Sequence, residues 1–137
     1  MTKDYIGTKI VTAWHETRDG KDGYAVKYSD GYISWSPKDI FEEAYRETSG
    51  IPFGLAIEAM KKGMRVARAG WNGKGMWLAM VTGSNWGIGG TAPYDYPDAP
   101  HVAHLDFIGM KTADNKFVPW LASQTDMLAD DWSIVNS

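Results

Sequence analysis

The chain has 137 residues, of which 44% are hydrophobic, and a formal net charge of −3. This length fits one globular domain, or one domain with a small appended module. The lack of cysteine excludes disulfides, thiol catalysis and cysteine-ligated zinc, and the acidic balance argues against general binding to nucleic acid. The apolar runs are too short to cross a membrane, and no export signal is visible. These features fit a cytoplasmic protein.

Residues 1–50 are predicted to form a small module of a β-meander followed by a helix. Three alternating segments predict its strands: residues 8–14, 24–28 and 32–35. Asp30-Gly31, between the last two, is a strong hairpin signal. Ser36-Pro37 then predicts an N-cap and the first residue of the helix. The module is too small to bury much surface alone, and we place its boundary at residues 48–50.

Residues 51–137 are predicted to form the main domain, a small antiparallel sheet with an N-terminal helix, so the fold class is α+β. The helix begins at Pro52 and ends at Gly63. The predicted strands are residues 65–68, 76–81, 105–110, 116–120 and an edge strand at 132–135, and a short helix is predicted at about 126–130. Asn72-Gly73 favours a tight hairpin turn. The long segment 83–104, rich in glycine and proline, is typical of a functional or mobile loop.

The positive charge of the chain is concentrated in its middle. Residues 51–90 carry five basic side chains against Glu58 alone, a local balance of +4: Lys61, Lys62, Arg65, Arg68 and Lys74. Lys61 and Lys62 fit a solvated helix face. The two arginines suit a small anion of one or two phosphates.

Two aromatic features have both a binding and a structural interpretation. The stretch from Pro119 to Trp132 places two tryptophans around a Ser-Gln-Thr-Asp block, a combination that suits a pocket for a flat polar molecule. Alternatively, both tryptophans belong to the core, and Ser123 or Thr125 caps a short helix. Trp71 stands beside glycines that let a ligand approach the backbone closely, or it merely covers a hairpin.

The sequence shows no catalytic constellation. Ser123 has no identifiable base, and Asp126, Asp130 and Asp131 better suit helix capping or hydroxyl binding than an acid–base pair. A metal site at His101, His104 and Asp106 is a minority interpretation, because an extended His-x-x-His points its rings to opposite faces. A binding protein without catalytic residues, metal or cofactor needs the fewest assumptions.

Residues 51–135 resemble the small phage-encoded family of anti-Thoeris sponge proteins. Four ordered blocks carry the resemblance: residues 53–63, 66–76, 110–114 and 118–132. The resemblance implies a small α+β fold that assembles as a homotetramer, a dimer of dimers, with ligand pockets shared between subunits. Residues 1–50 lie outside the short family form and resemble a small module found on various phage proteins, for which we assign no function.

The resemblance also implies an activity. Family members sequester cyclic ADP-ribose isomers, such as glycocyclic ADP-ribose, without cleaving them, and so keep the Thoeris effector silent in the cytoplasm of the infected bacterial host. Some relatives also bind cyclic dinucleotides at a separate site. Because the loop 83–104 is long and residues 105–109 carry extra positions, the preferred cyclic nucleotide is left open.

The family motifs imply roles for seven residues of this chain. Phe53 and Trp71 would stack on a base, Asn72 would supply hydrogen bonds, and Arg68 would contact a phosphate. The remaining three, in the C-terminal block, would contact the ligand or pack subunits together: Ser123, Thr125 and Asp126. Two alternatives remain, a hydrolase of the same messenger and an interaction module that binds a host or phage protein through its aromatic surface.

Overall fold

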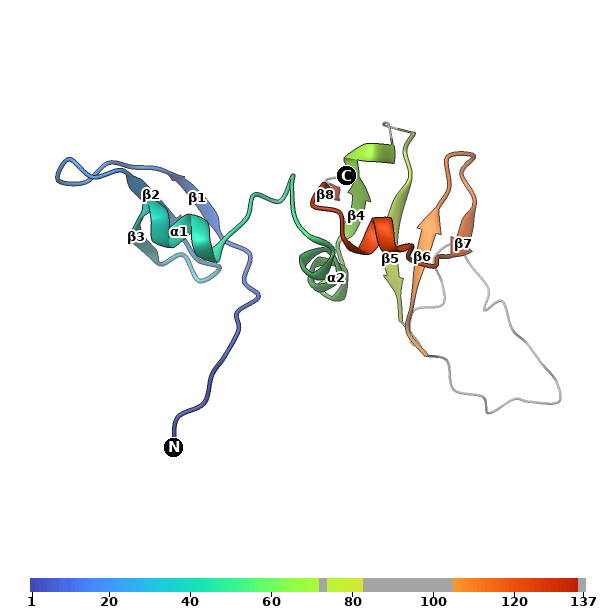
Figure 1. Ribbon diagram of the computed structural model, residues 1–137, viewed down its shortest axis with the longest axis horizontal. Coiled ribbons are helices and arrows are strands. Elements are labelled where there is room, and N and C mark those ends of the chain that lie inside the picture. Colours follow the sequence, from blue (N-terminus) through green and yellow to red (C-terminus); the bar gives the residue numbers. More distant parts are fainter. Residues whose placement is uncertain (72–73, 83–104, 136–137) are drawn as a thin grey trace. The chain divides into compact units, whose positions relative to one another are not determined.

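The computed structural model describes residues 1–71, 74–82 and 105–135. The chain divides into two compact units, Met1–Glu47 and Thr48–Ser137. The first is an antiparallel three-stranded meander with a helix, and the second is an antiparallel five-stranded sheet with short helices (Figure 1). The mixed α+β class predicted from the sequence is therefore confirmed. Within the described ranges no helix is long and apolar enough to cross a membrane.

The first unit contains strands β1 (Thr12–His15), β2 (Gly23–Lys27) and β3 (Ile33–Pro37), followed by helix α1 (Lys38–Ala44). The predicted hairpin is present, with Gly31 at a φ of +89° and the Asp30 carboxylate accepting a hydrogen bond from the Tyr32 N–H at 2.9 Å. Strand β1 begins later than predicted because Thr12 pairs with Lys27, the last residue of β2. Helix α1 also begins one position late: Ser36 still pairs with Tyr24, and Pro37 takes the N-cap place.

Aromatic side chains fasten α1 to the meander. The rings of Tyr24 and Phe41 stack at 4.3 Å between centroids, and the Tyr24 hydroxyl donates to the Glu42 carboxylate at 2.6 Å. That hydrogen bond to an acidic partner raises the pKa of Tyr24. On the other strand face the Trp35 indole covers Gly23 so closely that a Cβ there would overlap it. The unit thus has its own packed centre.

The second unit is built on a sheet with strand order β7-β6-β5-β4-β8. Its elements in chain order are α2 (Phe53–Lys61), β4 (Arg65–Arg68), the 3₁₀ turn η1 (Ala69–Trp71), β5 (Trp77–Val81), β6 (Phe107–Lys111), β7 (Phe117–Pro119), α3 (Gln124–Met127) and β8 (Trp132–Val135). The predicted edge position of β8 is confirmed. Helix α3 lies two to three residues before its predicted place because Ser123 caps it. The predicted loop 83–104 and the Asn72-Gly73 turn lie outside the described residues.

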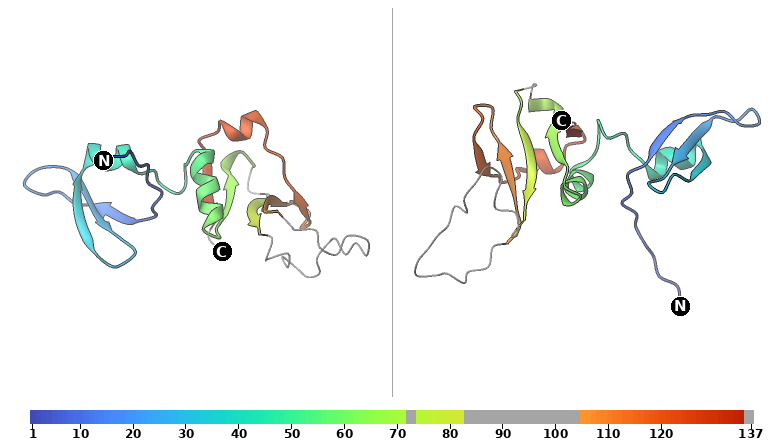
Figure 2. Two further views of the ribbon diagram at one scale, coloured as in Figure 1. Left: turned by 90° about the horizontal axis from the view of Figure 1, so that it is seen from below. Right: turned by 180° about the vertical axis from the view of Figure 1, so that it is seen from behind.

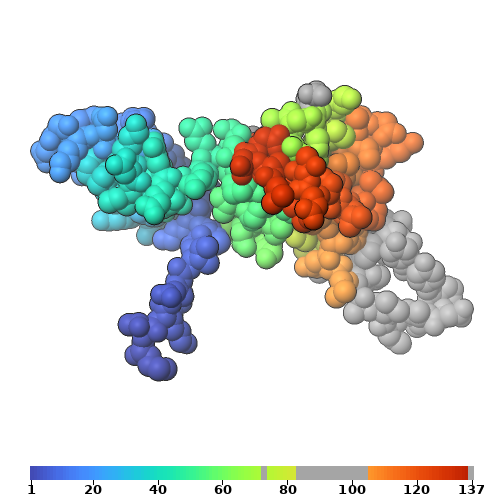
Figure 3. Space-filling view, in the orientation of Figure 1, coloured from blue at the N-terminus to red at the C-terminus, as the bar shows by residue number. Residues whose placement is uncertain are grey.

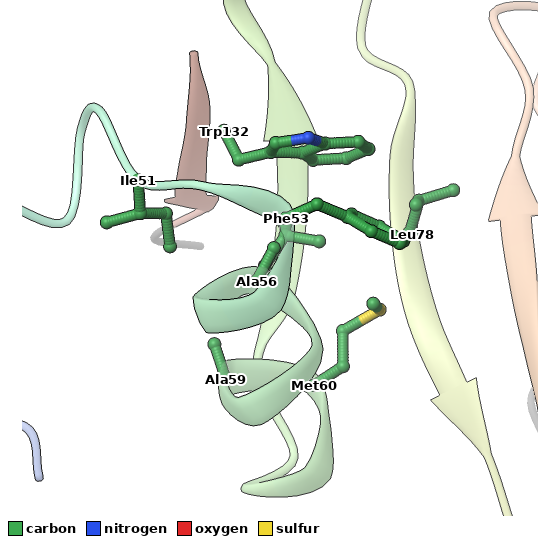
Figure 4. Close-up of a cluster of buried hydrophobic side chains, with 8 residues drawn as sticks. Ile51, Phe53, Ala56, Ala59, Met60, Leu78 and Trp132 are labelled. Atoms are coloured by element: carbon green, nitrogen blue, oxygen red, sulfur yellow. The ribbon is translucent and has the colours of Figure 1, made fainter. Parts of the chain in front are cut away.

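Helix α2 provides half of the core residues. Pro52 stands at its N-cap, and Gly63, at a φ of +88°, follows its end, as the sequence predicts. The helix lies against β4, β5 and β8 (Figure 2). The core residues are Ile51, Phe53, Ala56, Ala59, Met60, Val66, Leu78 and Trp132 (Figure 4). The largest fully buried side chain among them is Trp132, and the candidate site is built around it.

Candidate functional site

Trp132 is the centre of an aromatic cluster. Its side chain is 0% exposed, and its indole N–H donates to the backbone oxygen of Asp126 at 2.9 Å. Trp71 and Trp120 meet the Trp132 ring edge-on, at centroid distances of 5.4 Å and 6.0 Å, and Phe53 packs on it at 5.1 Å. The core interpretation is therefore correct for Trp132, whereas Trp120 and Trp71 are half-buried around it.

A polar network lies beside this cluster, where β4 passes into η1. The Arg68 guanidinium donates from Nε to Asp131 Oδ1 at 2.9 Å and from Nη1 to Asp126 Oδ1 at 2.8 Å. The other Asp131 oxygen, Oδ2, accepts from the Gly70 N–H at 3.0 Å. The side chains of Arg68, Asp126 and Asp131 are 17%, 16% and 34% exposed. In the space-filling view the segments around residues 70 and 130 lie next to each other on the same face of the second unit (Figure 3).

The ion pairs fix the charge state of this network. The Arg68 hydrogen bond holds the pKa of Asp131 below its usual 3.8. Burial opposes ionisation of Asp126, but hydrogen bonds from Ser123 and Arg68 outweigh it, so the pKa of Asp126 is also lowered. Both carboxylates are charged at neutral pH, and the three groups together carry −1, since one guanidinium faces two carboxylates. A phosphate at Arg68 would compete with both, and the predicted phosphate contact stays a prediction.

Ser123 and Asp126 form a capping box at the start of α3. The Ser123 hydroxyl accepts from the Asp126 N–H at 3.0 Å and donates to Asp126 Oδ2 at 2.8 Å, and that oxygen also accepts from the Ser123 N–H at 3.3 Å. Thr125 is exposed within the helix. The capping interpretation of the C-terminal block is thus correct for Ser123. Asp126 joins the cap to Arg68 and so ties α3 to the sheet.

The structure gathers part of the predicted site. Arg68, Trp71 and Asp126 lie around Trp132, and Ser123 reaches them through Asp126. Phe53 is only 8% exposed and belongs to the core. Asn72 lies outside the described residues, as do His101 and His104 of the minority metal interpretation. In the described part of the chain no group of three His, Asp or Glu side chains could hold a metal ion.

The two arginines of the basic stretch do not share one surface of the sheet. Arg65 and Arg68 are three positions apart on one strand, so their side chains belong to opposite faces. The Arg65 guanidinium lies 5.0 Å from the centroid of the Trp77 ring, and Arg68 is held by its two carboxylates. Lys61 pairs with Glu58 at 3.7 Å on α2. The positive excess of this stretch is therefore distributed over separate surfaces.

The sequence suggests capping or hydroxyl binding for Asp131 and does not reveal its place in this network. Its partner Arg68 lies 63 positions away. The signal is the pairing of β4 with β8, which brings Arg68 opposite Trp132 and next to Asp131. No local pattern reveals a pairing between such distant strands.

Fold and site together define a small α+β domain that presents a half-exposed tryptophan beside an ion-paired turn. The family described as the Thoeris anti-defense 2-like domain matches residues 51–135, all of them in the second compact unit. The chain belongs to that family. It is 44% identical over 90 residues to Thoeris anti-defense 2 of Bacillus phage SP01, an alignment that covers 61% of this chain and 93% of that protein.

Proposed function

We propose that this protein counters the Thoeris defence by binding a nucleotide messenger and holding it without cleaving it. The messenger is a cyclic ADP-ribose isomer, such as glycocyclic ADP-ribose, and the protein acts in the cytoplasm of the infected bacterial host. The observation that carries the proposal is family membership across residues 51–135. The matched region includes the whole aromatic and ionic cluster around Trp132, which supports a role for this cluster in the family's function.

The cluster offers chemistry that suits such a ligand. The messenger has an adenine base to stack, ribose hydroxyls to satisfy and a pyrophosphate. Trp71 is the predicted stacking aromatic that keeps exposed surface in the single chain, and stacking of one base contributes roughly 1–3 kcal/mol. The carboxylate of Asp126 can accept hydrogen bonds from the ribose hydroxyls. Phe53, buried behind Trp132, supports the cluster from the core side.

Capture rather than turnover follows from what a sponge must achieve. Holding a messenger at nanomolar concentration needs about 12 kcal/mol of binding free energy, which one stacked base does not supply. We propose that the rest comes from phosphate and hydroxyl contacts, including Asn72 and Arg68, and from pockets completed between subunits of a homotetramer. Tight capture of this kind is set mostly by a slow dissociation rate.

Isothermal titration calorimetry of the full chain tests the proposal. The panel is cyclic ADP-ribose isomers, linear ADP-ribose, NAD and common cyclic dinucleotides. We expect tight saturable binding of a cyclic ADP-ribose isomer, and loss of about 5-fold or more in affinity in Trp71→Ala, because stacking of about 1–3 kcal/mol is removed. Trp77→Ala is the matched control, a half-buried tryptophan of the same unit in contact with Arg65 and Phe117.

Three outcomes would count against the proposal or against the role of Trp71 in it. Lack of binding to every cyclic ADP-ribose isomer at micromolar protein would overturn the function. Equal affinity in wild type and Trp71→Ala would remove Trp71 from the site while leaving the function standing. Equal losses in both tryptophan variants would mean that stability, rather than stacking, sets the affinity.

A further inference from the structure

Asp131 binds every residue that leads from β4 into the Trp71 turn. Its side chain accepts from Arg68 Nε at 2.9 Å and from the Gly70 N–H at 3.0 Å. Its backbone oxygen accepts from the Ala69 N–H at 3.1 Å. Three successive residues are therefore fixed by one aspartate, immediately before Trp71. Because the backbone is held at each of these residues, the Cα–Cβ bond of Trp71 has a defined direction.

These contacts continue into a closed circuit. Trp71 meets Trp132 edge-on at 5.4 Å, with an angle of 80° between the rings. The Trp132 indole N–H is bound to the Asp126 backbone oxygen, and the Asp126 carboxylate is bound to Arg68. Arg68 returns the circuit to Asp131. The turn before Trp71 is thus held by an ion-paired frame, and the Trp71 ring itself packs against a fully buried ring.

We propose that Asp131 is a positioning residue, which holds the η1 turn so that the Trp71 ring is set for ligand before ligand arrives. This inference rests on the proposed function, because it assigns Trp71 the stacking role. Asp131 acts through the turn and needs no contact with the ligand. Fixing a side chain before binding removes its ordering cost from the binding step. We expect Asp131→Ala to weaken binding about threefold to tenfold.

The direction of the change in ligand affinity in Asp131→Ala distinguishes a positioning role from a simple electrostatic effect. The ligand is anionic, so removal of any nearby carboxylate reduces repulsion and should tighten binding or leave it unchanged. Asp130, the adjacent residue, is exposed and supplies a matched charge deletion. Electrostatics alone predicts the same direction for Asp130→Ala and Asp131→Ala. Positioning predicts weaker binding in Asp131→Ala only.

A readout in the free protein tests the turn without any ligand. The full chain is labelled with 5-fluorotryptophan, and the ¹⁹F resonance of Trp71 is assigned by its loss in Trp71→Phe. In Asp131→Ala we expect this resonance to broaden or to move toward the position of the free amino acid. In Asp130→Ala it should stay unchanged. Asp131→Asn keeps one carbonyl acceptor, which serves Gly70 or Arg68 but not both, so its effect should be intermediate.

The experiment distinguishes failure of this inference from failure of the proposed function. An unchanged Trp71 resonance in Asp131→Ala, or wild-type affinity in that variant, overturns the positioning role. If wild type binds no messenger, the function is overturned, and the ¹⁹F spectrum alone still decides whether Asp131 holds the turn. If Asp131→Ala does not fold, Asp131→Asn decides: an unchanged resonance and affinity there would overturn the inference.

Discussion

Replacing Arg68 with alanine removes the cation that pairs with both Asp126 and Asp131. Its two hydrogen bonds measure 2.9 Å and 2.8 Å, and they join β4 to the residue just before β8 and to helix α3. Without the guanidinium, two carboxylates that are 16% and 34% exposed face each other across the vacated space. The substitution therefore removes attraction and adds repulsion at the same place.

The partial burial of the three groups sets the magnitude. Exposed ion pairs contribute about 0.2–1 kcal/mol, whereas breaking a buried pair costs about 3–5 kcal/mol. With Arg68 at 17% exposure, we expect a loss of about 2–3 kcal/mol in the free energy of unfolding of the second unit. At an m value of about 1.5 kcal/mol per molar urea, the unfolding midpoint falls by about 1.3–2 M.

Urea unfolding of the full chain, followed by tryptophan fluorescence, measures this shift. Arg65→Ala is the matched control, since Arg65 is on the same strand but stacks on Trp77, an interaction of about 0.5–1 kcal/mol at such sites. A shift for Arg68→Ala no larger than that of Arg65→Ala would refute the reasoning. It would mean that the ionic frame around the Trp71 turn contributes nothing beyond an ordinary surface contact.

Three further predictions concern the cap, the acid limb and the first unit. Ser123→Ala should cost about 1 kcal/mol by urea unfolding because it removes the N-cap of α3, whereas Thr125→Ala, exposed on that helix, should change it little. The folded-state pKa values of Asp126 and Asp131 lie below 3.8, so their contribution is present above that pH and is lost as pH falls through the folded values. The acid-unfolding curve of Arg68→Ala should show a smaller loss, because only the hydrogen bonds from Ser123 and Gly70 then favour the charged carboxylates. Gly23→Ala should raise amide hydrogen exchange in β2 and β3 but not in β4 and β5, because the new methyl group overlaps Trp35. Gly7→Ala, with open space around its Cβ position, is its control.

Local patterns predicted most of the fold. Alternation and the Asp30-Gly31 signal gave the meander, and Pro52 and Gly63 mark the two ends of α2. The errors lie at boundaries that depend on partners elsewhere in the chain. The start of β1 is set by where β2 ends, and Ser36 stays in the sheet because it pairs with Tyr24. The local sequence does not indicate which residues of the two strands pair.

The candidate site was harder to predict because its geometry is non-local. Arg68 was singled out for its charge, yet its environment depends on the pairing of β4 with β8. That pairing makes Arg68 the centre of an ionic frame with Asp126 and Asp131, and its predicted phosphate contact stays a prediction. The sequence likewise suggests that the Phe53 ring could stack on a ligand. In the structure α2 packs on the sheet, and this packing leaves Phe53 only 8% exposed. Trp71 keeps exposed surface, so a ligand can reach its ring and the predicted stacking role can be tested directly.

The most direct test of the central claim is recovery of the messenger after capture. The full chain is incubated with an equimolar cyclic ADP-ribose isomer, separated from free ligand by rapid filtration, denatured by heat and examined by mass spectrometry. We predict that the protein fraction retains the ligand and then releases all of it as the intact cyclic species. Release of a linear product would make the protein a hydrolase, and lack of retention would contradict sequestration altogether.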